Sequence, residues 1–100
     1  MDNHQELTNR QAKILAAIVK ENSDSGKAVG SKDLADKYSF GLSAPSIRNE
    51  MQALEKQDFI KQRHTSAGRV PTDKGYRYFV NQLMDRFKLS LEEQNRLKKE

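Results

Sequence analysis

The sequence predicts a mainly α-helical fold with a small β-hairpin, built from about four helices and two to three short strands in 100 residues. Two observations support this class. Apolar residues recur at helical spacing in four segments, and each segment follows a serine or threonine that can cap a helix. Between the third and fourth segments, two short runs flank a loop of small residues, as in a hairpin. A chain of this length is expected to form one domain with a small core.

The first two helices are predicted from capping residues and apolar spacing. Thr8 and Gln11 form a capping box, in which each side chain can bond to a backbone N–H, so a helix is expected from about Asn9 to Glu21. Residues 27–30 can supply one short strand, and Ser31 is expected to cap the second helix. The residues expected to pack in these helices are Ile14, Leu15, Ile18, Val19, Leu34, Ala35 and Tyr38.

The third helix is expected to begin at Ser43, with Pro45 in its first turn, where the missing N–H costs nothing. Its inner face consists of Ile47, Met51 and Leu54. That face turns polar side chains outward. They are Asn49, Gln52 and Lys56, with Ser46 and Arg48 on the flanks.

A hairpin and a fourth helix complete the order. Residues 59–62 are expected to form one strand, residues 63–68 a turn, and residues 69–70 the returning strand, which Pro71 ends because it has no N–H to donate. Thr72 is expected to cap the fourth helix. Its predicted packing stripe is Tyr76, Phe79, Val80, Leu83 and Phe87. The order helix, short strand, helix, helix, strand, loop, strand, helix is that of a winged helix-turn-helix.

The composition of the sequence indicates where in the cell the protein is located. It has no cysteine, so neither a disulfide nor a thiolate metal site is available. No apolar run approaches the roughly 18 residues of a membrane span, and the polar N-terminus lacks the pattern of a signal peptide. A cytoplasmic protein is therefore predicted.

The net charge of +4 is unevenly distributed. Between Phe59 and Lys88, seven basic side chains face only two acidic ones. Such a surplus attracts polyanions over a Debye length of about 8 to 10 Å. An ordinary solvated surface can show the same balance, so charge alone does not decide between the two interpretations.

The third helix carries candidate groups for DNA recognition. A major groove about 12 Å wide accepts a helix, in which Asn49 and Gln52 can pair with adenine and Arg48 can reach guanine or phosphate. The small residues Ser43 and Ser46 permit close approach of a phosphate to the helix N-terminus. The alternative is a plain surface helix with solvated polar side chains.

The loop of the hairpin is a candidate wing. His64, Thr65, Ser66 and Arg69 are expected to contact the DNA backbone or the minor groove, and Lys74 in the next helix is expected to flank the same duplex. The alternative is a generic hairpin turn.

Gly75 lies inside the predicted start of the fourth helix, at a cost of about 1 kcal/mol relative to alanine. Either the wing packs closely against this glycine, or a phosphate does. The sequence leaves both explanations open.

No enzymatic activity, metal site or cofactor is predicted. His64 lies next to two hydroxyl residues, but no third group is evident to orient it and nothing resembles an oxyanion site. Two histidines without cysteines or clustered carboxylates do not provide a metal ligand set.

Several motifs together carry a family resemblance. They are Leu7-Thr8, Arg10-Gln11, Ile14-Leu15, Val29-Gly30-Ser31-Lys32, Leu34-Ala35, Ser46-Ile47-Arg48-Asn49-Glu50-Met51, Leu54-Glu55 and the run from His64 to Val80. In these motifs the sequence resembles the N-terminal winged-helix DNA-binding domain of HrcA, a family of bacterial heat-inducible transcription repressors. The last run is the most specific, because the third-helix motif alone would fit many winged helices.

This resemblance implies a repressor of heat-shock (chaperone) genes that binds an inverted-repeat operator in double-stranded DNA as a homodimer and responds to stress through a GroE-type chaperonin. It also implies that residues 1–88 form the DNA-binding domain. Residues 89–100 would then begin a helix or linker toward an absent C-terminal dimerisation and regulatory region, unless the chain is a natural single-domain relative. Asp58 replaces a glycine of the family and is expected to adopt the left-handed conformation.

Two other classes of function fit the sequence less well. A winged helix that serves as a protein-interaction module would need an apolar outer face on the third helix, and its outward residues are polar. A ligand-sensing regulator would need a pocket, for which so short a chain offers little apolar composition.

Overall fold

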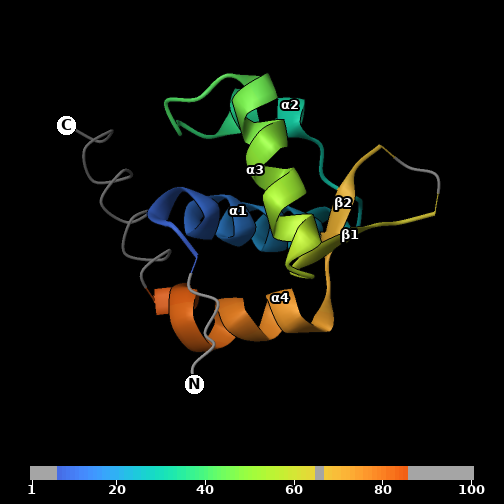
Figure 1. Ribbon diagram of the computed structural model, residues 1–100. Coiled ribbons are helices and arrows are strands. Elements are labelled where there is room, and N and C mark those ends of the chain that lie inside the picture. Colours follow the sequence, from blue (N-terminus) through green and yellow to red (C-terminus); the bar gives the residue numbers. More distant parts are fainter. Residues whose placement is uncertain (1–6, 65–66, 86–100) are drawn as a thin grey trace.

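The computed structural model describes residues 7–64 and 67–85, and it contains helices and one antiparallel hairpin (Figure 1). The elements are α1 (Asn9–Ser25), α2 (Ser31–Lys37), α3 (Ala44–Lys56), β1 (Ile60–Gln62), β2 (Arg69–Pro71), α4 (Asp73–Tyr78) and the π-helical turn η1 (Phe79–Leu83). The mainly helical fold with a small β-wing is confirmed. The predictions for Thr65, Ser66, Phe87 and residues 89–100 lie outside the described residues.

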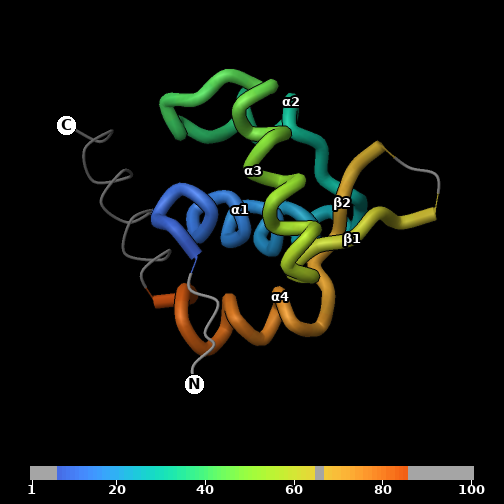
Figure 2. Tube along the Cα trace, in the orientation of Figure 1, coloured from blue at the N-terminus to red at the C-terminus, as the bar shows by residue number. Residues whose placement is uncertain are grey.

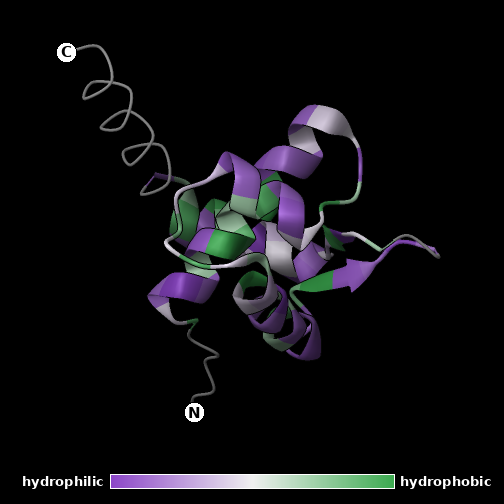
Figure 3. Cartoon of the chain, turned by 90° about the horizontal axis from the view of Figure 1, so that it is seen from above, coloured by the Kyte–Doolittle hydropathy of each residue, from purple (hydrophilic) through white to green (hydrophobic). Residues whose placement is uncertain are grey.

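Helix α1 lies at the centre of the domain, between α2 and α3 on one side and α4 with η1 on the other, while the hairpin projects from the body (Figure 2). The core fills the space between these helices. In Figure 3 hydrophobic residues gather where the helices meet, whereas β1 becomes hydrophilic beyond its first residue. The largest fully buried side chains are Phe59, Ile14, Leu15, Ile18, Leu34, Ile47, Leu54 and Ile60.

Helix α1 begins with the predicted capping box. The Gln11 N–H donates to Thr8 Oγ1 at 3.0 Å, and the Thr8 N–H donates to Gln11 Oε1 at 3.3 Å. The predicted end at Glu21 is wrong, because the helix continues to Ser25. The last turn consists of polar residues, but its backbone still forms helical hydrogen bonds. The helix ends at Gly26, which has a left-handed φ of 72°.

Helix α2 and its cap each begin one residue earlier than expected. Gly30 is the N-cap and makes no side-chain bond, and Ser31 is the first helical residue, so the capping role predicted for Ser31 is wrong. The strand expected at residues 27–30 is reduced to one bridge, in which Val29 and Arg69 exchange N–H···O bonds of 2.8 and 2.9 Å. It cannot be longer because the chain turns into α2 at Gly30.

Glu21 joins α1 to the end of α2. Its carboxylate accepts hydrogen bonds from Lys37 Nζ at 2.9 Å and from the Tyr38 hydroxyl at 2.8 Å. These bonds, with that from Lys37 the larger cause, lower the pKa of Glu21. Burial, followed by the bond to Glu21, raises the pKa of Tyr38.

Because of the bonds to Glu21, part of the free energy of unfolding is expected to depend on pH. Because the pKa of Glu21 is lower in the folded state than its ordinary 4.5, the stabilisation is present above about pH 4.5 and is lost as the pH falls through the lowered pKa. Glu21→Gln should therefore lower the thermal midpoint by a few degrees at pH 7 and by less at pH 3. Thermal melts across this range measure the difference.

The control for this experiment is Asp36→Asn, which changes an exposed carboxylate on α2. Its difference from the parent chain should vary little over the same range. A difference for Glu21→Gln that is as large at pH 3 as at pH 7 would show that the carboxylate charge is not what stabilises the junction.

Helix α3 forms as the sequence predicts. Ser43 caps it by accepting the Ser46 N–H at 3.3 Å, and Pro45 lies in the first turn. The inner row is buried and consists of Ile47, Met51 and Leu54. The helix ends as Asp58 adopts the predicted left-handed conformation, with φ of 72°.

The hairpin pairs β1 with β2 in antiparallel register. Ile60 lies opposite Pro71, so the proline is the last residue of β2 and ends the ladder. Thr72 then caps α4 by accepting the Gly75 N–H at 3.0 Å. The hairpin therefore leads directly into a capped helix.

The packing stripe predicted for the last helix is wrong in part. Phe79 and Leu83 are buried, but Tyr76 is 52% exposed and Val80 is 41% exposed. Gly75, Phe79 and Leu83 form the row that faces the body. Tyr76 and Val80 each follow that row by one residue, which places them about 100° further around the helix.

The structure answers the question that Gly75 raised. A Cβ built on Gly75 would overlap the carbonyl oxygen of Phe59 and lie 3.0 Å from its carbonyl carbon. The group that needs the glycine is therefore the backbone just before β1, which is neither the wing loop nor a phosphate.

Candidate nucleic-acid interface

The outer side of α3 presents a row of polar side chains. Arg48, Asn49 and Gln52 are exposed, opposite the buried row of the helix. Among residues 7–64 and 67–85, these three side chains make no hydrogen bond or ion pair. They are therefore available to an external partner, and their groups can donate to or accept from base edges.

The start of α3 is organised by two serines. The Ser43 hydroxyl donates to Ser46 Oγ at 3.1 Å and accepts the Ser46 N–H. Ser43 is exposed and Ser46 is half-buried. Both hydroxyls thus fix the first turn, and both residues are small enough to let a phosphate approach it.

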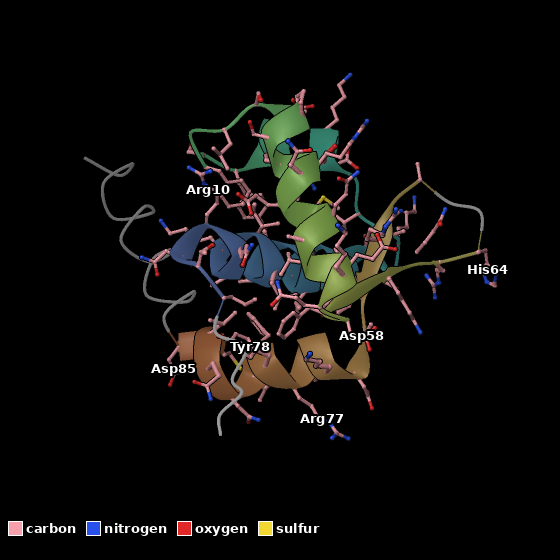
Figure 4. All side chains as sticks on the ribbon, in the orientation of Figure 1. Arg10, Asp58, His64, Arg77, Tyr78 and Asp85 are labelled. Carbon is pink, nitrogen blue, oxygen red and sulfur yellow. The ribbon has the colours of Figure 1, made fainter. Side chains whose placement is uncertain are left out.

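The wing projects beyond the body of the domain. His64 lies at its far end and points away from the helices (Figure 4), in a left-handed conformation with φ of 55°. Arg63, one residue earlier, donates from Nη1 to the Gly26 carbonyl at 3.1 Å. Of the predicted wing contacts, His64 is therefore placed outward, while Thr65 and Ser66 lie outside the described part of the chain.

Arg69 lies at the base of the wing and is held there. Its Nε donates to Glu55 Oε1 at 2.9 Å, and its Nη1 donates to the carbonyls of Ala67 and Gly68 at 3.0 and 3.2 Å. The side chain is 23% exposed. Unlike Arg48, this arginine already has a carboxylate partner.

Lys74 is also anchored within the domain. Its Nζ donates to the Gln57 carbonyl at 2.7 Å and lies 4.5 Å from the centroid of the Phe59 ring. Arg77 pairs with Asp73 at 3.6 Å on the exposed surface of α4, on the side of the domain away from α3 (Figure 4).

The structure thus leaves some of the predicted site residues free to contact DNA and shows that others bond within the domain. The α3 row and the outward wing are accessible, whereas Arg69 and Lys74 also stabilise the fold around the end of α3. Glu55 was not predicted as a site residue, although it belongs to one of the motifs that carry the family resemblance. It meets Arg69 across 14 residues, and no periodicity or motif signals such a pairing.

Within the described ranges, no group of three or more histidine, cysteine, aspartate or glutamate side chains is placed to hold a metal ion. None of the helices in that part of the chain is both long and apolar enough to cross a membrane.

Two comparisons with known proteins identify the class of domain to which the chain belongs. A family model described as a probable winged helix domain matches residues 1–71. A crystal structure of a hypothetical protein at 2.2 Å resolution superimposes with a TM-score of 0.75 and 40% identity, over 79% of this chain and 25% of that one. The chain belongs to the winged-helix domain family.

Curated relatives specify the class further. Heat-inducible transcription repressor HrcA of Pelotomaculum thermopropionicum is 47% identical over 94% of this chain, and HrcA of Thermomicrobium roseum is 51% identical over 89%. HrcA of Limosilactobacillus reuteri is 51% identical over 79%. These relatives are transcription repressors, a non-enzymatic class of protein. The chain is homologous to them and spans 23–27% of their length.

Proposed function

We propose that this chain binds double-stranded DNA sequence-specifically and acts in repressing the transcription of heat-shock genes. The observation that carries the proposal is the exposed polar row of α3 beside a projecting wing. The fold and the names of the relatives support the same function. A chain with this role would work in the cytoplasm, where bacterial DNA is located.

In this proposal α3 lies in the major groove. Arg48, Asn49 and Gln52 read base edges, while Ser43 and Ser46 bring the helix start close to the DNA backbone. The remaining proposed contacts come from the wing and α4, where they meet the backbone or the minor groove. They are His64, Thr65, Ser66 and Lys74, whereas Arg69, which the sequence also predicts as a contact, is already paired with Glu55.

The proposal extends to the whole repressor. Residues 1–88 would form the DNA-binding domain, and two such domains in a homodimer would occupy an inverted-repeat operator upstream of chaperone genes. A GroE-type chaperonin would be the partner that maintains the active repressor. These statements rest on the family resemblance.

Binding should depend strongly on salt. If one domain neutralises about 4 phosphates, the logarithm of its affinity should fall against the logarithm of salt concentration with a slope of about −3.6. Fluorescence anisotropy with a labelled operator half-site, measured at several salt concentrations, gives this slope. A scrambled duplex of equal length serves as the control for sequence preference.

The outcome separates this function from the runner-up. A flat salt response, or equal affinity for operator and scrambled duplex at all salt concentrations, would contradict sequence-specific DNA binding. The alternative, a winged helix used as a protein-interaction module, would then gain weight. The structure gives it little support, because the exposed row of α3 is polar.

A further inference from the structure

Arg69 connects three separate parts of the domain at the base of the wing. Its Nε bonds to Glu55 of α3 at 2.9 Å, and its Nη1 bonds to the carbonyls of Ala67 and Gly68 in the wing loop. Its backbone N–H and carbonyl bond to Val29, just before α2. One residue therefore links the wing to α3 and to the segment just before α2.

The backbone beside Arg69 leaves little freedom at this point. A Cβ built on Gly68 would lie 2.9 Å from atoms of Ala28 and Val29. The chain at the start of β2 thus packs directly against the segment before α2. The outgoing strand is tied to α3 by the backbone, since the Phe59 N–H donates to the Leu54 carbonyl at 3.0 Å. The Glu55–Arg69 pair adds a side-chain link between α3 and the returning strand.

The charges at this site disfavour a direct contact between Arg69 and a DNA phosphate. Glu55 is 38% exposed and lies on α3, so a phosphate that approached Arg69 would also approach the Glu55 carboxylate. The guanidinium would have to share or leave its partner, and the gain from a phosphate contact would be reduced by repulsion.

We propose that Glu55 and Arg69 are positioning residues, whose ion pair fixes the angle between the wing and α3 so that both reach the same duplex. This inference rests on the proposed DNA-binding function. It gives Arg69 a different role from the direct backbone contact expected from the sequence. It also assigns a role in DNA binding to an acidic residue, which general electrostatics would not predict.

The test uses three variants, Glu55→Gln, Arg69→Gln and the double change, in titrations against operator and scrambled duplex. Each single variant should weaken operator binding roughly fivefold, as expected for losing a partly exposed ion pair. The double variant should be no weaker than either single one, because both remove the same link. Thermal midpoints measured alongside report how much of each variant is folded.

The matched control is Glu50→Gln. Glu50 lies on the same helix and pairs with Arg10 at 3.4 Å, at the interface with α1 instead of the wing. This change removes the same negative charge, so DNA binding should stay the same or strengthen slightly. Similar behaviour of Glu55→Gln and Glu50→Gln would overturn the proposal.

Two other outcomes would also overturn it. If Arg69 grips phosphate directly, Arg69→Gln alone should reduce the magnitude of the salt slope by about 0.9, while Glu55→Gln leaves affinity unchanged or raises it. If the pair only supports folding, the affinity losses should disappear once they are corrected for the folded fraction.

A measurement without DNA separates failure of this inference from failure of the proposed function. In the NMR spectrum, the Arg69 Nε–H resonance should shift in Glu55→Gln and stay in place in Glu50→Gln. If it responds in this way but the parent chain binds no duplex, the proposed function fails and the ion pair stands. If it does not respond, the positioning role fails whatever the DNA titrations show.

Discussion

Gly75→Ala is expected to destabilise the domain by about 3 kcal/mol or more, at the upper end of overpacking effects. The added methyl would overlap the Phe59 carbonyl oxygen, which is backbone and cannot rotate away. That carbonyl also accepts the Thr72 N–H at 3.1 Å, so moving it would disturb the cap region of α4. The gain of about 1 kcal/mol in helix propensity from alanine is too small to offset this.

Gly30→Ala is the matched control for this change. A Cβ on Gly30 would meet only Asp33 Oδ2 at 3.9 Å, and its φ of −103° suits any residue. Its cost should stay within about 1 kcal/mol, the usual effect of losing a glycine N-cap. Urea unfolding of both variants gives the comparison.

The result also distinguishes the contact with Phe59 from the phosphate explanation that the sequence left open for Gly75. If a phosphate were what needs the glycine, Gly75→Ala should retain its unfolding midpoint and lose DNA affinity. A midpoint as high as that of Gly30→Ala would therefore contradict the close contact with Phe59.

Arg48→Ala is expected to reduce the discrimination between operator and scrambled duplex by roughly 1 to 3 kcal/mol, which is about 5- to 150-fold in the ratio of affinities. Arg48 is exposed on α3 and has no partner among the described residues, so its loss should change stability by less than about 0.5 kcal/mol. Anisotropy titrations with both duplexes at one salt concentration measure the effect.

Arg77→Ala is the charge-matched control, because Arg77 lies on α4, away from α3, and is paired with Asp73. It should change both affinities little and leave their ratio unaltered. If Arg48→Ala weakens both duplexes equally, Arg48 contacts phosphate and another residue of the α3 row reads the bases.

The local elements were largely predictable because their signals lie within a few residues of one another. The Thr8–Gln11 capping box, the Ser43 and Thr72 caps, and the left-handed Asp58 all depend on short-range hydrogen bonds or steric limits, and each appears as expected. The end of α1 was misjudged because polar residues carry no periodic signal, although their backbone can still continue a helix.

The packing stripe of the last helix was predicted wrongly in part because it depends on contacts between distant segments. Spacing alone did not show which side of the last helix faces the body, since Tyr76 and Val80 fit a helical stripe as well as Phe79 and Leu83 do. The close approach of Phe59 to Gly75 selected the row, and Tyr76 and Val80 were left exposed.

The sequence alone therefore determined the order of elements, the inner face of α3 and the polar groups on its outer side. Only the tertiary structure decided which cations are already paired, that Phe59 requires Gly75, and that Glu55 meets Arg69 at the base of the wing. The physical reason is the range of the interactions. Caps and periodicity act along the chain, whereas these contacts exist only after packing has brought α3, the wing and α4 together.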